Sequence, residues 1–156
     1  MTYKEYREEA QKEYDALPIF WAFSDEQFEK EMNKRGLTVN DTDKIYRMKN
    51  TGGFFLRKDA DQIHAFFAKP DKLSELMKDY DFAYDAILYE MNNHEYAINW
   101  QRDWDVCSVF GNVEYTEDDD ELLQYFEQLG WEETTRKAYR DARKEHFRIA
   151  EEGGWF

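Results

Sequence analysis

Residues 93–112 hold the densest group of chemically reactive side chains in this sequence. The stretch NHEYAINWQRDWDVCSVFGN contains a histidine, several acids and the only cysteine of the chain. A histidine with carboxylates can move protons in a small hydrolase or transferase, and a cysteine with a histidine can form a nucleophile pair. The candidate catalytic residues are therefore His94, Asp103, Asp105 and Cys107.

Each candidate also has a structural interpretation. A lone cysteine within DVCSVF is more often a buried small residue than a nucleophile, because free cysteine is among the most buried residue types. Close carboxylate pairs such as Asp103 and Asp105 arise by chance in a chain with 35 acids. The other histidines, His64 and His146, fall in helical patterns, where packing or a salt bridge is the expected role.

The pattern favours no metal site. No second histidine lies within a turn of His94, and the chain has neither a pair of cysteines nor a His-Glu-x-x-His motif. Gly52 and Gly53 are adjacent, but their spacing matches no phosphate-binding loop and is typical of a turn. We expect neither a metal nor another cofactor.

The elements that must position the candidates are predicted to be two strands. Apolar residues alternate with polar ones from Tyr96 to Trp100, a period of two that indicates a strand. Residues 101–103 would form the turn, and residues 104–110 the returning strand. This predicted hairpin would place His94 and the two aspartates near its ends or edges.

A first hairpin is predicted upstream, from residues 45–48 and 54–57 with a turn through 50–53. Residues 19–23, IFWAF, form a short apolar connector or strand. Apolar spacing and capping residues predict helices at residues 2–16, 25–35, 59 or 61–69, 73–77, 81–93, 122–129 and 132–151. The last of these is basic along much of its length, and we expect it to lie against the acidic part of the chain.

The expected fold class is α+β in a single domain, residues 1–156. A small antiparallel sheet of about four strands, formed by the two hairpins, would be packed by six or seven helices. A length of 156 residues is sufficient for a core without disulfides or metals. The polar N-terminus and the lack of a long apolar run favour a cytoplasmic protein that does not enter a membrane.

The net charge of −14 is concentrated in one third of the chain. Residues 70–121 carry 15 acidic and 3 basic side chains. This charge disfavours direct contact with nucleic acid and favours the basic surface of a nucleic-acid-binding protein, such as a defence nuclease. The candidate partner-binding residues are Asp79, Asp81, Asp85, Glu117, Asp118, Asp119 and Asp120. The structural alternative is that the charge only keeps an aromatic-rich protein in solution.

Three segments resemble a family of small, uncharacterised acidic proteins carried by bacterial phages and integrative mobile elements. They are ALPIFWAFSDEQFEKEM, HEYAINWQRDWDVCSVFGN and AYRDARKEHFRIAEEGGWF, and the likeness spans nearly the whole chain. The resemblance implies no activity and no catalytic residues. By analogy of class with small acidic anti-restriction and anti-CRISPR proteins, it favours inhibition of a host defence protein.

Three hypotheses follow from the sequence. The first is an acidic inhibitor that imitates the phosphates of a nucleic acid, since rows of carboxylates can compete for the same basic channel. The second is a small hydrolase or transferase that uses His94 with Asp103 or Asp105. The third is a structural or regulatory interaction module of the mobile element.

Overall fold

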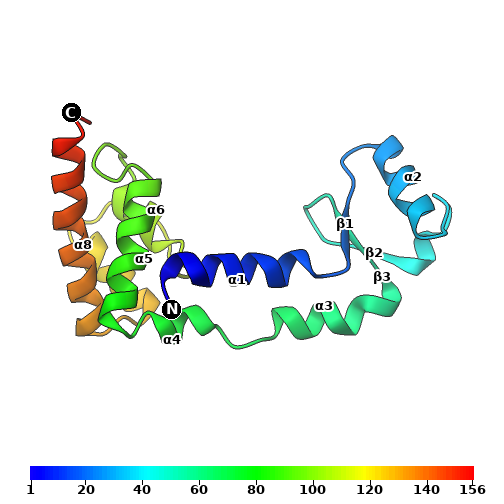
Figure 1. Ribbon diagram of the computed structural model, residues 1–156, viewed down its shortest axis with the longest axis horizontal. Helices are drawn as coiled ribbons and strands as arrows, with labels where there is room; N and C mark the ends of the chain where they lie inside the picture. The colour runs from blue at the N-terminus through cyan, green and yellow to red at the C-terminus, as the bar shows by residue number, and fades with distance from the viewer. The chain divides into compact units, whose positions relative to one another are not determined.

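The computed structural model describes residues 1–156 and divides the chain into two compact units (Figure 1). Unit 1 comprises residues 1–8 and 71–156, and unit 2 comprises residues 9–70. The division falls inside the first helix, α1 (Tyr3–Asp15), so this helix contributes to both units. The prediction that the whole chain folds as one domain stays a prediction, and each unit is described by itself.

Unit 2 contains a three-stranded antiparallel sheet in the order β1-β3-β2. Its elements after α1 are β1 (Ile19–Trp21), α2 (Asp25–Lys34), the 3-10 helix η1 (Thr42–Lys44), β2 (Ile45–Arg47), β3 (Gly53–Leu56), the 3-10 helix η2 (Arg57–Asp59) and α3 (Ala60–Phe67). Strand β3 is central, and Phe55 lies opposite both Ile19 and Tyr46. The predicted first hairpin is therefore confirmed, and the IFWAF segment supplies the third strand.

Local sequence explains why these elements of unit 2 begin and end where they do. Ser24 caps α2 by accepting a hydrogen bond from the backbone N–H of Gln27 at 3.1 Å, and the Gln27 side chain accepts one from the backbone N–H of Phe23 at 2.8 Å. The residue after the α2 C-cap is Gly36, whose φ of +72° is accessible to glycine without strain. The core of unit 2 is a small cluster of Phe20, Met32 and Ile45.

The regular secondary structure of unit 1 consists of helices alone. After the first residues of α1 it contains α4 (Lys72–Leu76), α5 (Tyr80–Asn93), α6 (Arg102–Cys107), α7 (Glu121–Leu129) and α8 (Glu133–Glu152). Helices α5 and α8 run side by side and form its main packing contact (Figure 1). Between them and α6 and α7 lies the larger core, in which Ile87, Met91, Tyr125 and Tyr139 are fully buried. Burial of such side chains stabilises the fold by about 1.5–3 kcal/mol each.

The predicted second hairpin at residues 96–110 is wrong. Helix α5 ends at Asn93, and the chain reverses at Glu95, whose φ is +51°. The backbone N–H of Tyr96 then returns to the Met91 carbonyl at 3.0 Å, and the N–H of Ala97 donates to His146 rather than to a neighbouring strand. The segment predicted as the returning strand instead contains α6.

The α+β class is confirmed, with two differences in detail. The sheet has three strands rather than about four, and there are eight α-helices rather than six or seven, because α6 replaces the second hairpin. The basic helix α8 does pack against α5 of the acidic third, as expected. None of the helices combines the length and the apolar composition that a membrane crossing requires.

Candidate functional site

His94 lies at the C-cap of α5 and faces a buried carboxylate. Its Nε2 is 3.3 Å from Oε2 of Glu90, which is only 3% exposed. Glu90 also accepts a hydrogen bond from the hydroxyl of Tyr3 at 2.7 Å, and Arg7 approaches it at 3.9 Å. Burial, and then the hydrogen bond to Glu90, raise the pKa of Tyr3. His94 therefore belongs to a contact that fastens the start of α1 to α5.

Asp103 lies in a different network, formed with two tyrosines. The hydroxyl of Tyr96 donates to Oδ1 of Asp103 at 2.7 Å, and the hydroxyl of Tyr139 donates to the same oxygen. Burial raises the pKa of both tyrosines, and the nearby Asp103 carboxylate raises them further, so both remain donors at neutral pH. This arrangement satisfies a carboxylate that is only partly accessible to water.

Cys107 and Asp105 are also engaged in structural contacts. Cys107 is fully buried, and burial, followed by the proximity of Asp103, raises the pKa of its thiol. A protonated, buried thiol is a poor nucleophile. Asp105 accepts a hydrogen bond from the side-chain amide of Asn99, which also donates to the His94 carbonyl at 3.3 Å.

The structure therefore brings the four candidate catalytic residues into one region but gives their side chains separate partners. Cys107 and Asp103 interact through Tyr139, whereas the imidazole of His94 contacts Glu90. No group of three or more His, Cys, Asp or Glu side chains is arranged to hold a metal ion. The prediction from sequence did not single out Glu90, although its position four residues after Ala86 and eight after Phe82 places it on the buried face of α5.

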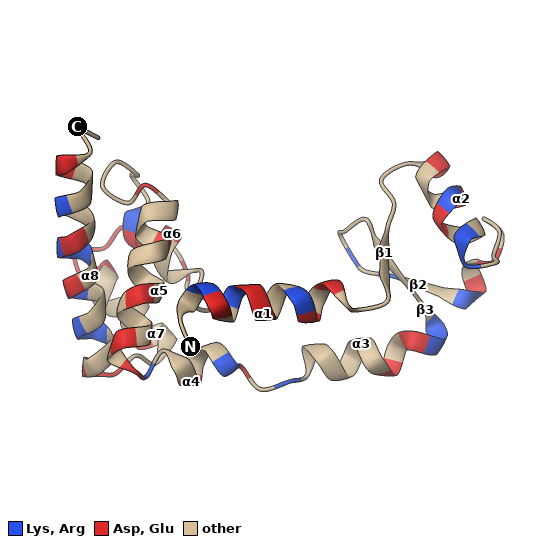
Figure 2. Cartoon of the chain, in the orientation of Figure 1, with Lys and Arg blue, Asp and Glu red and all other residues tan.

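Three of the candidate partner-binding residues lie on the first half of α5. Asp79 is the N-cap of this helix and accepts a hydrogen bond from the backbone N–H of Phe82 at 2.9 Å. Asp85 accepts one from the backbone N–H of Tyr3 at 2.9 Å. All three are exposed, and α5 carries Asp and Glu but no Lys or Arg, as its red and tan ribbon shows (Figure 2).

The other four candidates form an exposed loop immediately before α7. We call residues 117–120 the acidic loop; all of them are exposed. Glu117 accepts a hydrogen bond from the hydroxyl of Tyr115 at 2.9 Å, which raises the pKa of Tyr115 to about 12. Asp118 and Asp120 accept hydrogen bonds from the side chain of Gln124 at 3.1 and 2.8 Å.

None of these seven acids forms an ion pair with a Lys or Arg. The cations of α8 pair mainly with acids of the same helix, as Lys137 does with Asp141 at 2.6 Å and Arg148 with Glu152 at 2.7 Å. Three of the six cations of α8, namely Lys137, Arg140 and Arg148, are therefore paired with carboxylates of their own helix. The α5 acids and the acidic loop keep an uncompensated negative charge.

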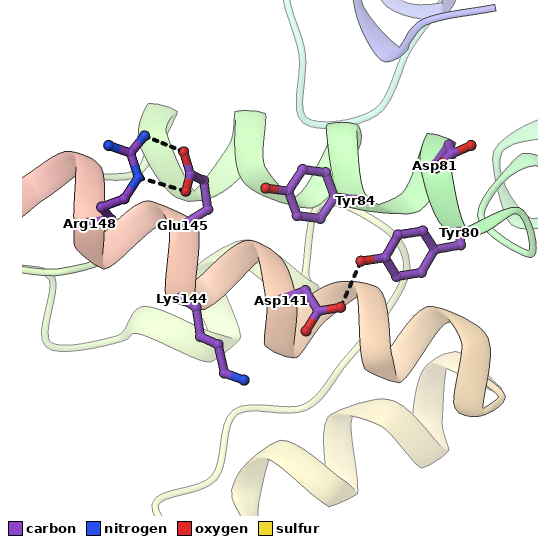
Figure 3. Close-up of a pocket in the computed structure, with 7 residues that line it drawn as sticks. All are labelled: Tyr80, Asp81, Tyr84, Asp141, Lys144, Glu145 and Arg148. Atoms are coloured by element: carbon purple, nitrogen blue, oxygen red, sulfur yellow. Dashed lines mark hydrogen bonds and ion pairs between the residues drawn. The ribbon is translucent and has the colours of Figure 1, made fainter.

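In a groove between α5 and α8, by contrast, most of the acidic side chains have a partner (Figure 3). It has a volume of about 560 Å³ and is lined by Tyr80, Asp81, Tyr84, Asp141, Lys144, Glu145 and Arg148. The hydroxyl of Tyr80 donates to Asp141 at 2.6 Å, and Arg148 lowers the pKa of the Glu145 carboxyl. Of the candidate partner-binding residues, only Asp81 lines this groove, whose other acids are already paired.

An exposed aromatic pair lies beside the acidic loop. Trp100 is 76% exposed and meets the ring of Tyr115 edge to face, at 6.3 Å between ring centres. Trp104 also packs against Tyr115, at 5.9 Å between ring centres, and its indole N–H donates to the Val113 carbonyl at 3.1 Å. Large exposed aromatic side chains are typical of protein-binding hot spots. Trp100 is not among the partner-binding residues predicted from the sequence.

Comparison with known proteins gives a family but no activity. A search of curated proteins found no match, and neither did a search of solved structures. A model of a family of unknown function, DUF7659, matches residues 2–142 and therefore covers most of both units. The chain belongs to this uncharacterised family, DUF7659.

Proposed function

We propose that the protein is an acidic inhibitor, encoded by a phage or another mobile genetic element, that binds the basic surface of a nucleic-acid-handling host defence protein. The target would be of the restriction or CRISPR type, and the inhibitor would compete with its nucleic acid. The observation that carries the proposal is that seven exposed acids on α5 and the acidic loop have no cationic partner within the chain.

The surroundings of the acidic loop support protein binding rather than solubility alone. An exposed aromatic surface lowers solubility, and one that is bordered by charged residues is typical of a protein-binding site. Trp100 and Tyr115 add a large apolar contact next to Glu117. The combination suits a partner whose basic residues surround an apolar or cationic side chain.

The test is a comparison of two variants that change the charge equally. The loop variant carries Glu117→Gln, Asp118→Asn, Asp119→Asn and Asp120→Asn. The control carries Asp25→Asn, Glu26→Gln, Glu29→Gln and Asp61→Asn, four exposed acids of unit 2. Proteins captured from a bacterial lysate by the wild type are identified, and their affinity for each variant is measured between about 0.05 and 0.3 M salt.

The expected result is a captured DNA- or RNA-binding protein whose affinity falls at least about tenfold with the loop variant and little with the control. Duplex DNA should displace the wild-type protein from it. Equal binding by both variants would end the mimicry proposal and favour a structural or regulatory module of the mobile element. Turnover that is lost in His94→Ala and Asp103→Ala, with the fold intact, would favour the hydrolase or transferase.

A further inference from the structure

A hollow on unit 2 is rich in positive charge, in a chain whose net charge is −14. It has a volume of about 400 Å³ and is lined by Arg35, Leu37, Asp43, Lys44, Leu56, Arg57 and Lys58. Four cations and one acid give this lining a net charge of +3. The hollow is therefore a local exception to the acidic character of the chain.

Two of the four cations have no carboxylate partner. Arg35 pairs with Glu31 at 2.9 Å, and Lys44 lies 3.6 Å from Asp41. Neither Arg57 nor Lys58 forms an ion pair. Since both are exposed, their charge is available to a ligand.

The guanidinium of Arg57 is held in position by contacts that leave its outer nitrogens free. Its Nε lies 3.5 Å from the Ile45 carbonyl, and its central carbon lies 4.6 Å from the centre of the Tyr46 ring. A guanidinium that lies over a ring and directs Nε toward a carbonyl presents its two terminal nitrogens as a fork, which matches two oxygens of a phosphate. Preorganisation of this kind reduces the entropy lost on binding.

We propose that this hollow binds the phosphate group of a small phosphorylated molecule. Arg57 and Lys58 contact the phosphate oxygens, and Leu37 and Leu56 contact an apolar part of the same molecule. The volume falls within the range of about 300–1,000 Å³ typical of small-molecule sites. A long nucleic acid is disfavoured because unit 2 outside the hollow carries more acids than bases, and unit 1 is strongly acidic.

The experiment uses inorganic pyrophosphate as the probe and titrates the full chain by calorimetry at constant ionic strength. We expect saturable binding at one site per chain. Arg57→Ala with Lys58→Ala should weaken it by about tenfold or more, as expected for the loss of charge-assisted hydrogen bonds. The matched control is Lys30→Ala with Lys49→Ala, which removes two exposed cations of the same unit outside the hollow.

Two further measurements locate the site and protect the test against misfolding. Backbone amide shifts on adding pyrophosphate should concentrate at Lys44, Arg57 and Lys58. Arg57→Lys keeps the charge but not the fork, so it should fold and still bind more weakly than the wild type.

Three outcomes would overturn the proposal. They are the absence of saturable binding, an equal loss of affinity in the two double variants, and tighter binding of single-stranded DNA than of pyrophosphate. The last would identify a nucleic-acid surface instead. None of these results bears on the acidic loop, so the test is independent of the proposed inhibitor function.

Discussion

The two units of the chain differ in charge and in the chemistry of their cores. Unit 1 carries 24 acidic and 11 basic side chains, a net charge of −13, whereas unit 2 carries 11 and 10, a net of −1. The buried polar side chains, Glu90, Thr135 and His146, all lie in unit 1. Every buried side chain of unit 2 is apolar.

The two units contain a similar proportion of charged residues, but these residues have different roles in each. In unit 2 some cations serve local structure, as the Arg35 guanidinium does by covering the buried ring of Phe20 at 4.0 Å and pairing with Glu31. Arg57 and Lys58 of the same unit have no carboxylate partner. In unit 1 the core is held by hydrogen-bonded polar groups, while the acidic loop has no cationic partner. Unpaired charge on the unit with the larger core is the arrangement expected of a recognition surface on a stable support.

The largest expected effect comes from truncating a fully buried methionine in each unit. Met32 of unit 2 and Met91 of unit 1 are both 0% exposed, and Met→Ala at such a site costs about 2–5 kcal/mol. Because unit 2 has the smaller core, we expect Met32→Ala to remove amide protection in β1–β3 while α5 and α8 stay protected in hydrogen exchange. Met91→Ala should remove amide protection in α5 and α8 of unit 1.

This pair of variants also tests the single-domain prediction. If Met32→Ala lowers protection equally in both units, the chain unfolds as one cooperative domain and the contrast between the cores has no energetic consequence. Two separate unfolding transitions would show that the two units differ in stability.

The sequence predicts most of the helices and the first hairpin because local rules decide them. Ser24 with Gln27, Gly36 after α2 and Gly130 after α7 mark helix ends that depend on capping or on positive φ alone. The hairpin around Gly53 depends on a turn with similarly local chemistry. Boundaries at these positions agree with the structure to within a few residues.

Residues 96–110 could not be assigned by the same rules, because this segment contains both the alternation of a strand and the spacing of a helix. The alternation from Tyr96 to Trp100 indicates a strand, yet Tyr96 and Ala97 are both buried, and Ile98 and Trp100 are exposed. The spacing of Asp103, Val106 and Cys107 also fits a helix, and the structure forms α6 over these residues. The backbone N–H of Ala97 donates to His146, a tertiary contact, and is therefore not available to a neighbouring strand.

In the candidate site, too, some features follow from the local sequence and others depend on contacts between distant residues. Exposure of the acidic loop follows from its composition, whereas the hydrogen bond that Glu90 accepts joins it to Tyr3, 87 positions away. No local pattern reports such a contact. The chemical role of a carboxylate is therefore predictable here only where the chain leaves it in solvent.

A smaller effect is expected from removing one hydroxyl from the polar core of unit 1. Tyr139→Phe deletes a donor to Asp103 and leaves Tyr96 as the remaining tyrosine donor, which should cost about 1–3 kcal/mol in urea unfolding. The control is Tyr14→Phe in unit 2, whose ring packs on Phe66 and whose hydroxyl makes no hydrogen bond within the chain. Its cost should stay below about 0.5 kcal/mol. Similar losses in the two variants would contradict the role given to the buried network.

The smallest effect is a pH dependence that distinguishes the histidines of the two units. Nε2 of the buried His146 accepts a hydrogen bond from the Ala97 N–H at 2.9 Å, so its proton is on Nδ1, which lies 2.7 Å from Oδ1 of Asn92. Burial lowers the pKa of His146 below its usual value. Protonation would also convert Nε2 from an acceptor into a donor, so it could no longer accept the Ala97 N–H.

The unfolded state therefore binds the proton more readily than the folded state. The contribution of His146 to stability is complete above the unfolded pKa of about 6.5 and is lost as pH falls from there toward the lower folded pKa. His64 is exposed on α3 of unit 2 and serves as the matched control. Urea unfolding from about pH 7.5 to 5 should show a slope that His146→Gln reduces and His64→Gln leaves unchanged. A slope that survives His146→Gln would assign the pH dependence to other titratable groups and remove this distinction between the two units.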